Sequence, residues 1–273
     1  MDSCAPIGIF DSGIGGLTVV KELRQMLPNE DLIYMGDTAR VPYGSRDPQE
    51  IVQFMHQNMH FFMAQKVKMV VIACNTTTTN GYAIAKEMYS VPIIPMNSAI
   101  CEAIEAGGGN KRIGVIATEA TVHNEMHRRS AEEIDAAVEI YAKACPDFVP
   151  LIEGGQIAGP EIEAAAQKYM GFFKGIGIGS LILGCTHYPL IADILRKHLS
   201  TGIHLVNPAR ATVLDAVTQL KKEQLLHQGK NKGGLKMCFS ADIEKARKMV
   251  KLVLNVNTAE FKCVDLTKYE ASK

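Results

Sequence analysis

The chain has 273 residues, of which 47% are hydrophobic and 21% charged, and its formal net charge is zero. Zero net charge without a basic block argues against nucleic acid or an anionic membrane as the main partner, and no apolar run reaches the roughly 20 residues of a membrane-spanning helix. The N-terminal residues lack a secretory signal pattern and the seven cysteines show no C-x-x-C spacing, so we expect a cytoplasmic protein with free thiols and no metal site.

The first predicted strand, at 7–10, runs into the polar, glycine-rich segment 11–16 and then into a helix. Leu17 and Val20 begin an apolar stripe at helical spacing. A strand, a glycine loop and the start of a helix together offer free backbone N–H groups to an anion. The dinucleotide fingerprint G-x-G-x-x-G is incomplete, because Thr18 stands where its third glycine belongs. We therefore expect a small polar ligand at this loop rather than a pyrophosphate.

Strands and helices alternate through the rest of the first half. The predicted segments are a strand at 31–35, a helix from Pro48 with Asp47 as its cap, a strand at 70–73, a helix through 81–89 and a strand at 91–94. This alternation predicts a parallel sheet covered by helices on both faces. Ligands bind beyond the carboxyl ends of such strands, which is where Asp11, Asp37 and Cys74 fall.

Short sequence motifs of the first half of the chain recur in the second half in the same order. The matching pairs are 113–116 with 7–10, Val149-Pro150 with Val41-Pro42, and Cys185 with Cys74, each separated by roughly 110 residues. This pattern indicates an internal duplication of an α/β unit. Two similar halves that face each other with pseudo-twofold symmetry would place one thiol on either side of a shared cleft.

Alternating elements continue after the second cysteine. They are a helix at 190–199, an apolar segment at 204–206, a helix from Asn207-Pro208 to about 227, a loop at 229–234, a strand at 235–239, a helix at 243–253, a last strand at 261–266 and a frayed tail from Lys268. The predicted fold class is α/β, with two pseudo-symmetric domains, each a parallel-rich sheet flanked by helices, and with the active site in the cleft between them.

Two apolar runs each lead to a cysteine at the start of a polar loop. The run 70–73 precedes Cys74 and the run 181–184 precedes Cys185, and hydroxyl and amide side chains follow at once. Inversion of a carbon that bears an acidic hydrogen needs a base on one face and an acid on the other, and a cysteine with a pKa of about 8.5 serves as either. Neither a lysine motif for pyridoxal phosphate nor a flavin loop is evident, so no cofactor is expected.

Four longer motifs carry a resemblance to a known family. They are Phe10-Asp11-Ser12-Gly13-Ile14-Gly15-Gly16-Leu17-Thr18, Gly36-Asp37-Thr38-Ala39-Arg40-Val41-Pro42-Tyr43-Gly44, Ala73-Cys74-Asn75-Thr76 and Gly184-Cys185-Thr186-His187-Tyr188-Pro189. The chain resembles the bacterial glutamate racemases, of the aspartate/glutamate racemase family, over nearly its whole length. The resemblance implies cofactor-independent interconversion of L- and D-glutamate, which provides D-glutamate for peptidoglycan synthesis and so for cell-wall biogenesis and cell shape. A homodimer is compatible with it.

The resemblance also implies roles for individual residues. Cys74 and Cys185 match the two acid–base thiols, of which the first takes the α-proton from D-glutamate and the second takes it from L-glutamate. The other catalytic candidates are Asp11 and His187, which match groups that assist the thiols, and Asp37 and Glu153 as lesser candidates. The positions that match substrate contacts are Asp11, Ser12, Tyr43, Gly44, Asn75, Thr76, Thr186 and His187.

Discontinuous domains follow from the same resemblance. The first domain is expected at 1–97 and 208–273 and carries Asp11 and Cys74. The second is expected at 98–207 and carries Cys185 and His187.

Two stretches depart from the usual pattern of the family. Thr77-Thr78-Thr79 stands where the family often has a single small residue. Pro95-Met96-Asn97-Ser98 lies at the expected domain crossing, where a glycine, two apolar residues and a proline are usual. These departures bear on domain closure and substrate choice rather than on the thiols.

Three other functions remain open. A related two-thiol isomerase that acts on aspartate, a hydantoin or maleate would keep both cysteines. A hydrolase with Cys185 and His187 as nucleophile and base would leave Cys74 dispensable, although residues two apart on a loop seldom align in these roles. A ligand sensor without turnover, or a regulatory function with a protein partner, is the third.

Simpler structural roles are available to several of these residues. Asp11 could cap the following helix, Asp37 could order its loop, Glu153 could belong to a turn, and His187 could be a structural donor. His56 with His60, and His123 with His127, have metal-ligand spacing but no third ligand, so solvated helix faces are expected. The cysteines expected to be small core residues are Cys4, Cys101, Cys145, Cys238 and Cys263.

Overall fold

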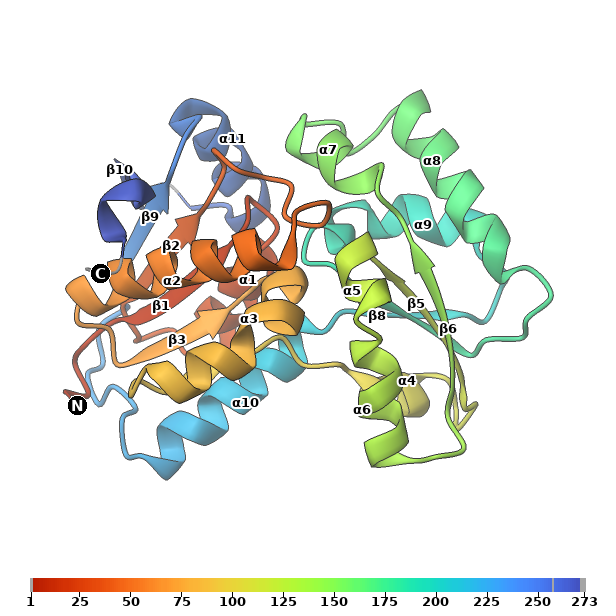
Figure 1. Ribbon diagram of the computed structural model, residues 1–273, viewed down its shortest axis with the longest axis horizontal. Coiled ribbons are helices and arrows are strands. Elements are labelled where there is room, and N and C mark those ends of the chain that lie inside the picture. The colour runs from red at the N-terminus through yellow and green to blue at the C-terminus, as the bar shows by residue number, and fades with distance from the viewer. Residues whose placement is uncertain (1, 257, 271–273) are drawn as a thin grey trace.

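Two separate parallel sheets organise the chain, and Figure 1 shows them side by side, each with its own helices. The computed structural model describes residues 2–256 and 258–270. The first sheet has six strands in the order β10-β9-β2-β1-β3-β4, and the second has four in the order β6-β5-β7-β8. We call each sheet with the helices that cover it a lobe.

The first lobe is built from both ends of the chain. Its strands are β1 (Ile7–Asp11), β2 (Leu32–Gly36), β3 (Met69–Ile72), β4 (Ile93–Ile94), β9 (Leu235–Phe239) and β10 (Glu260–Cys263). Its helices are α1 (Leu17–Met26), α2 (Pro48–Ala64), α3 (Asn75–Met88), α10 (Ala209–Lys222), α11 (Ile243–Leu254) and the 3-10 helix η3 (Leu266–Tyr269). Every strand pair in this sheet is parallel.

Side chains of the central strand β1 alternate between two apolar layers, as the pleat of a strand requires. Ile7 and Ile9 pack in the layer formed with α1, α10 and α11. Phe10 packs in the opposite layer, where its ring centroid lies 6.3 Å from that of Phe62 on α2. Helices therefore cover both faces of the sheet. The carboxyl ends of its strands remain available for a functional site.

The second lobe comes from the middle of the chain. Its strands are β5 (Arg112–Ala117), β6 (Glu139–Ala144), β7 (Ser180–Gly184) and β8 (His204–Val206), all parallel. Its helices are α4 (Ile100–Ala106), α5 (Glu119–His123), α6 (Met126–Ile134), α7 (Phe148–Glu153), α8 (Pro160–Met170) and α9 (Ala192–His198), with the 3-10 helices η1 (Gly171–Phe173) and η2 (Tyr188–Ile191).

The two sheets share one strand order. In the first sheet, the strands β2, β1, β3 and β4 are neighbours in that order. In the second sheet, β6, β5, β7 and β8 are neighbours in the equivalent order, so that β5 corresponds to β1, β6 to β2, β7 to β3 and β8 to β4. Cys74 comes after β3 and Cys185 directly after β7, so the thiols occupy equivalent places in the two lobes. The predicted α/β class, with two parallel sheets flanked by helices, is confirmed, and the duplication read from the sequence has a topological counterpart.

The start of α2 shows how local sequence sets an element boundary. The Asp47 side chain accepts a hydrogen bond from Gln49 N at 2.8 Å, and the Glu50 carboxylate accepts one from Asp47 N at 3.3 Å. Pro48 occupies the first helical position, where its missing N–H has no cost. These contacts satisfy backbone donors that the first helical turn would otherwise leave without partners.

We propose the predicted domain boundaries, 1–97 with 208–273 and 98–207, for the two lobes. Their support is that the strands of the first sheet end at Ile94 and resume at Leu235, while those of the second lie between 112 and 206. The segment 95–98, which departs from the usual pattern of the family, connects the first lobe to the second and is hydrogen-bonded to α10. Asn97 N donates to Thr212 Oγ1 at 2.9 Å, and Asn97 Nδ2 donates to Asp215 Oδ2 at 2.8 Å.

Several predicted elements need correction. The helix expected to reach about residue 227 ends at Lys222, and the segment 190–199 divides into η2 and α9. The tail expected to fray from Lys268 instead contains the end of η3, and the carbonyl of Tyr269 lies 3.0 Å from His60 Nδ1 of α2. Residues 271–273 of that prediction lie outside the described residues.

The predictions for the histidines, and for the cysteines other than Cys74 and Cys185, were wrong in part. His127 is buried rather than solvated, and His56 contacts the Tyr89 hydroxyl at 2.9 Å. Cys145 and Cys238 are buried as expected, and the exposed thiols are Cys4, Cys101 and Cys263. Within the described ranges, no group of three or more His, Cys, Asp or Glu side chains is arranged to hold a metal ion. None of the helices that the structure describes is long and apolar enough to cross a membrane.

Candidate active site

Asp11 anchors the site from the first lobe. It ends β1, its side chain is fully buried, and its carboxylate accepts hydrogen bonds from Gly13 N at 3.1 Å and Gly16 N at 3.0 Å. Thr186 of the second lobe donates its hydroxyl to the same carboxylate at 3.3 Å. Burial raises the pKa of Asp11, while the nearby charge of His187 acts in the opposite direction. Asp11 thus orders the glycine loop and links the two lobes.

Cys74 lies between β3 and α3, at the N-cap position of the helix. Its side chain is only 4% exposed, and its Sγ lies 3.8 Å from Ser12 Oγ. Burial raises the pKa of Cys74 to about 11, and the negative charge of Asp11 adds to this shift. The charge of Cys185 raises the pKa of Cys74 further. The Cys74 side chain is therefore a thiol at neutral pH.

Cys185 belongs to a chain of buried acid–base groups. Its Sγ lies 3.6 Å from His187 Nδ1, and His187 Nε2 lies 2.6 Å from Glu153 Oε1. Burial alone would lower the pKa of His187, but its hydrogen bonds to Cys185 and Glu153 outweigh burial and raise the pKa well above the ordinary value. His187 thus lies between the sulfur of Cys185 and the carboxylate of Glu153, where it is placed to exchange a proton with the sulfur. Residues two apart on this loop do align, contrary to the sequence-based expectation.

Glu153 joins this chain to the first lobe. It ends α7, it is 8% exposed, and its Oε1 accepts a hydrogen bond from Ile14 N of the glycine loop at 2.8 Å. The close approach also depends on missing side chains, because a Cβ on Gly13 would lie 1.9 Å from the same oxygen. The absence of a side chain at Gly13 therefore allows this close contact between the lobes.

Asn75 and Thr76 open α3 beside the first thiol, and both are buried. Neither amide atom of Asn75 has a hydrogen-bond partner among the described residues. A buried amide without partners costs free energy unless a ligand supplies them. The Thr76 hydroxyl lies 2.9 Å from that of Thr118. This end of the site thus has hydrogen-bonding capacity reserved for a small polar molecule.

Thr118 and Thr121 are site residues that the sequence analysis missed. Thr118 follows β5 as Ser12 follows β1, and its hydroxyl donates to Thr121 Oγ1 at 3.1 Å. The duplication contained the signal for Thr118, because the match of 113–116 with 7–10 extends to the hydroxyl residues Thr118 and Ser12. Gly44 packs directly against Thr118, since a Cβ at Gly44 would lie 2.6 Å from the Thr118 Cβ.

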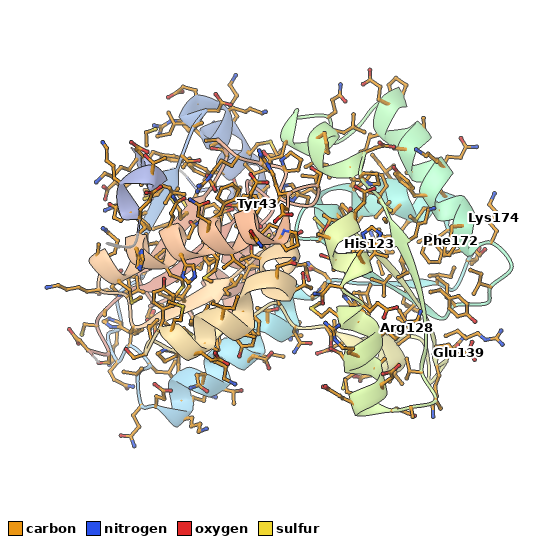
Figure 2. All side chains as sticks on the ribbon, in the orientation of Figure 1. Tyr43, His123, Arg128, Glu139, Phe172 and Lys174 are labelled. Atoms are coloured by element: carbon orange, nitrogen blue, oxygen red, sulfur yellow. The ribbon has the colours of Figure 1, made fainter. Side chains whose placement is uncertain are left out.

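Asp37 organises the loop that carries Tyr43. It follows β2, it is fully buried, and it accepts hydrogen bonds from Arg40 Nε at 2.6 Å, from Ser240 Oγ at 2.8 Å and from the Tyr43 hydroxyl. Arg40 in turn lies over the Phe54 ring, 4.0 Å from its centroid. Figure 2 shows Tyr43 on the first lobe, on the side that faces the second. Asp37 therefore holds Arg40, Tyr43 and Ser240 together through its carboxylate.

Two buried thiols, which follow equivalent strands of a duplicated fold, form an arrangement suited to acid–base proton transfer. The sequence profile of the Asp/Glu/Hydantoin racemase family matches residues 7–216, and the chain belongs to this family. The resemblance seen in the motifs is therefore confirmed.

Named relatives and solved structures agree with this assignment. "Glutamate racemase 2" of Caldanaerobacter subterraneus subsp. tengcongensis is 42% identical over 269 residues, which cover 98% of this chain and 100% of the relative. The glutamate racemase of Francisella tularensis in complex with D-glutamate has a TM-score of 0.88 and 34% identity, over 98% of this chain and 100% of that one. The enzyme of Thermus thermophilus, in complex with β-chloro-D-alanine, has a TM-score of 0.84 and 34% identity over the same shares.

Proposed function

We propose that this chain interconverts L- and D-glutamate by a two-thiol mechanism. The observation that carries the proposal is the pair of buried thiols, Cys74 and Cys185, at equivalent strand ends of the two lobes. Family membership and the full-length likeness to glutamate racemases give the substrate. Peptidoglycan synthesis would use the product D-glutamate, and we place the enzyme in the cytoplasm; a homodimer is a further proposal.

In the L-to-D direction Cys185 acts as the base. Its thiolate, which lies beside His187, takes the α-proton, and the Cα–H electron pair remains on the substrate as an enolate-like carbanion. Cys74 then donates its S–H proton to the opposite face of the α-carbon. The reverse direction starts from the form with Cys74 as thiolate and Cys185 as thiol, so that Cys74 takes the proton from D-glutamate and Cys185 donates its own to the opposite face. Asp11, whose charge acts on Cys74 and whose carboxylate accepts from Thr186, the residue after Cys185, accompanies the transfer through its charge.

The polar side chains around the thiols are proposed to hold the substrate. Asn75 offers an amide that has no hydrogen-bond partner among the described residues, Ser12 offers a hydroxyl, and Thr76 and Thr186 offer hydroxyl oxygens that accept. Fixed dipoles of this kind stabilise the charge that develops on the substrate carboxylate during proton abstraction. The further contacts proposed are Tyr43, Gly44, Asp11 and His187, with Asp37 and Glu153 as groups that hold Tyr43 and His187 in place.

Circular dichroism of the purified protein with L-glutamate tests the proposal. The optical activity should decay to zero without any added cofactor and after dialysis against a chelator. Aspartate should react at least about tenfold more slowly, because one methylene in a fitted pocket is worth about 1–3 kcal/mol. Equal rates on the two amino acids would instead favour the broader isomerase alternative.

Gly15→Ala should lower kcat/KM for glutamate by about 10²-fold, the cost of a displacement of roughly 1 Å in a reacting site. The added Cβ would lie 2.4 Å from His187 Nδ1 and 2.6 Å from Thr186 Oγ1, so the second-lobe loop must move. Gly171→Ala is the matched control, because its Cβ meets nothing within 4 Å. An unchanged kcat/KM in Gly15→Ala would show that the position of this loop does not limit the reaction.

A further inference from the structure

A cavity in the second lobe lies outside the thiol site. Its volume is about 150 Å³, and its lining residues come from β5, β6, α5, α6 and the segment that joins the two helices. The polar and charged members are Thr121, Glu125, His127 and Arg128. Figure 2 labels Arg128 on this lobe. Nothing in the proposed reaction uses these charged groups.

His127 is a buried histidine without a partner at one nitrogen. It is 4% exposed, and its Nε2 has no hydrogen-bond partner among the described residues. Burial lowers its pKa to about 4, so that it is neutral at neutral pH. A buried nitrogen of this kind costs free energy unless a bound molecule pairs with it. His127 also packs under the second thiol strand, because a Cβ at Gly184 would lie 3.2 Å from His127 Cε1.

A row of hydroxyls leads from the cavity to the thiol site. Thr118 donates its one hydroxyl proton to Thr121 Oγ1, at 3.1 Å. The Thr76–Thr118 contact at 2.9 Å must therefore have Thr76 as its donor. Thr76 is left with oxygen lone pairs for the ammonium of a substrate, and Thr121 is left with a proton for a partner in the cavity that it lines. A partner there would strengthen each bond in the row.

Charges of both signs stand at the same cavity. Arg128 Nε and Glu125 Oε1 are 3.5 Å apart, and their side chains are 54% and 60% exposed. Such an exposed pair contributes little to stability and is easily exchanged for a ligand. A guanidinium matches a carboxylate, and a carboxylate matches an ammonium group. The pair of Arg128 and Glu125 therefore suits a zwitterionic ligand. A further small polar group on that ligand would match the buried imidazole of His127.

We propose that this cavity is a regulatory site for a small polar amino acid. The ligand carboxylate binds Arg128 and the Thr121 hydroxyl, its ammonium group binds Glu125, and a side-chain hydroxyl pairs with the imidazole of His127. Occupancy orders the Thr121–Thr118–Thr76 row and so tightens glutamate binding. Only this last step rests on the proposed racemase function.

Saturation-transfer NMR with L-serine as the probe tests the site on the full-length protein. Serine should bind saturably, and Arg128→Gln should weaken its binding at least about tenfold, because a charge-assisted hydrogen bond is lost. L-Alanine, which lacks the hydroxyl for His127, should bind more weakly than serine. Arg247→Gln is the matched control, since Arg247 forms a similar exposed pair with Glu244 at 3.7 Å; this variant should bind serine as the wild type does.

Two results would overturn the cavity assignment. One is equal serine affinity in the wild type and in Arg128→Gln. The other is displacement of serine by glutamate in direct competition, which would place serine between the thiols. These binding readouts hold even if the protein has no racemase activity, so that the two proposals fail separately.

The coupling is tested by the KM for glutamate. Saturating serine should lower KM in the wild type and leave it unchanged in Thr121→Val, which cannot transmit through a hydroxyl. Arg128→Gln should keep its basal kcat and KM and lose the response to serine. Serine binding in the cavity with no change in the wild-type KM would overturn the regulatory role.

Discussion

Replacement of either thiol by alanine is expected to lower kcat/KM for racemisation by at least roughly 10³-fold in both directions. Every passage between the enantiomers uses one thiol as base and the other as acid, so that loss of either group blocks both directions. The double variant Cys74→Ala/Cys185→Ala should be little worse than the single ones, as is found for groups that act as a unit. Circular dichroism with each enantiomer measures these rates.

The thiol prediction has a control within the same sheet. Cys238 of β9 is also fully buried but lies outside the site, and Cys238→Ala should leave kcat/KM nearly unchanged. Turnover in D₂O should place deuterium on the product enantiomer while the remaining substrate stays protonated early in the reaction. Ordinary activity in Cys74→Ala together with its loss in Cys185→Ala would contradict the two-thiol mechanism. The Cys185–His187–Glu153 arrangement would then favour the hydrolase alternative.

His187→Asn should lower kcat/KM by about 10²-fold, because an amide cannot exchange a proton with Cys185 as the imidazole does. The raised pKa of His187 means that the wild-type imidazole carries its positive charge at neutral pH, and the substitution removes that charge. The two enantiomers have equal free energies, so kcat/KM must fall by the same factor in both directions. The asymmetry should appear in the primary isotope effect, which should grow for α-deuterated L-glutamate more than for the D-enantiomer.

His198→Asn is the matched control for this prediction. His198 Nε2 lies 2.8 Å from Glu163 Oε2, so that it forms a second His–Glu pair in the same lobe, away from the thiols. Its replacement should change neither the rate nor the isotope effects. Equal growth of the isotope effect for both enantiomers of glutamate in His187→Asn would contradict the pairing of His187 with Cys185.

Much of the fold could be predicted from the sequence because its signals are local. Apolar runs that end in Asp11 or Cys74 predict buried strands, and the Asp47-Pro48 pair predicts the start of α2. The edge strand β6 was missed. Its residues are mostly half-exposed and its sequence, Glu-Ile-Tyr-Ala-Lys-Ala, has neither a continuous apolar run nor a clear turn signal before it. Pairing with β5 decides that this segment is a strand.

The site, like the fold, could be predicted from the sequence only in part. The motifs with Cys74 and Cys185 identified the thiols and the polar loops that follow them, because each motif is contiguous in the chain. The partners of the thiols could not be read in this manner. Glu153 accepts from Ile14, 139 residues away, and a sequence pattern carries no information on such a contact. The contacts of Asp37 with Tyr43 and Ser240 could not be read either, since Ser240 lies 203 residues away in the chain.

The sequence by itself determined the α/β class, the duplication and the two thiols, since periodicity and contiguous motifs are properties of neighbouring residues. Only the tertiary structure decided that His187 is held between Cys185 and Glu153, that Thr118 faces Thr76, and that His127 is buried. Burial and charge–charge contact set the pKa of each group, and both depend on which distant segments the two sheets bring together.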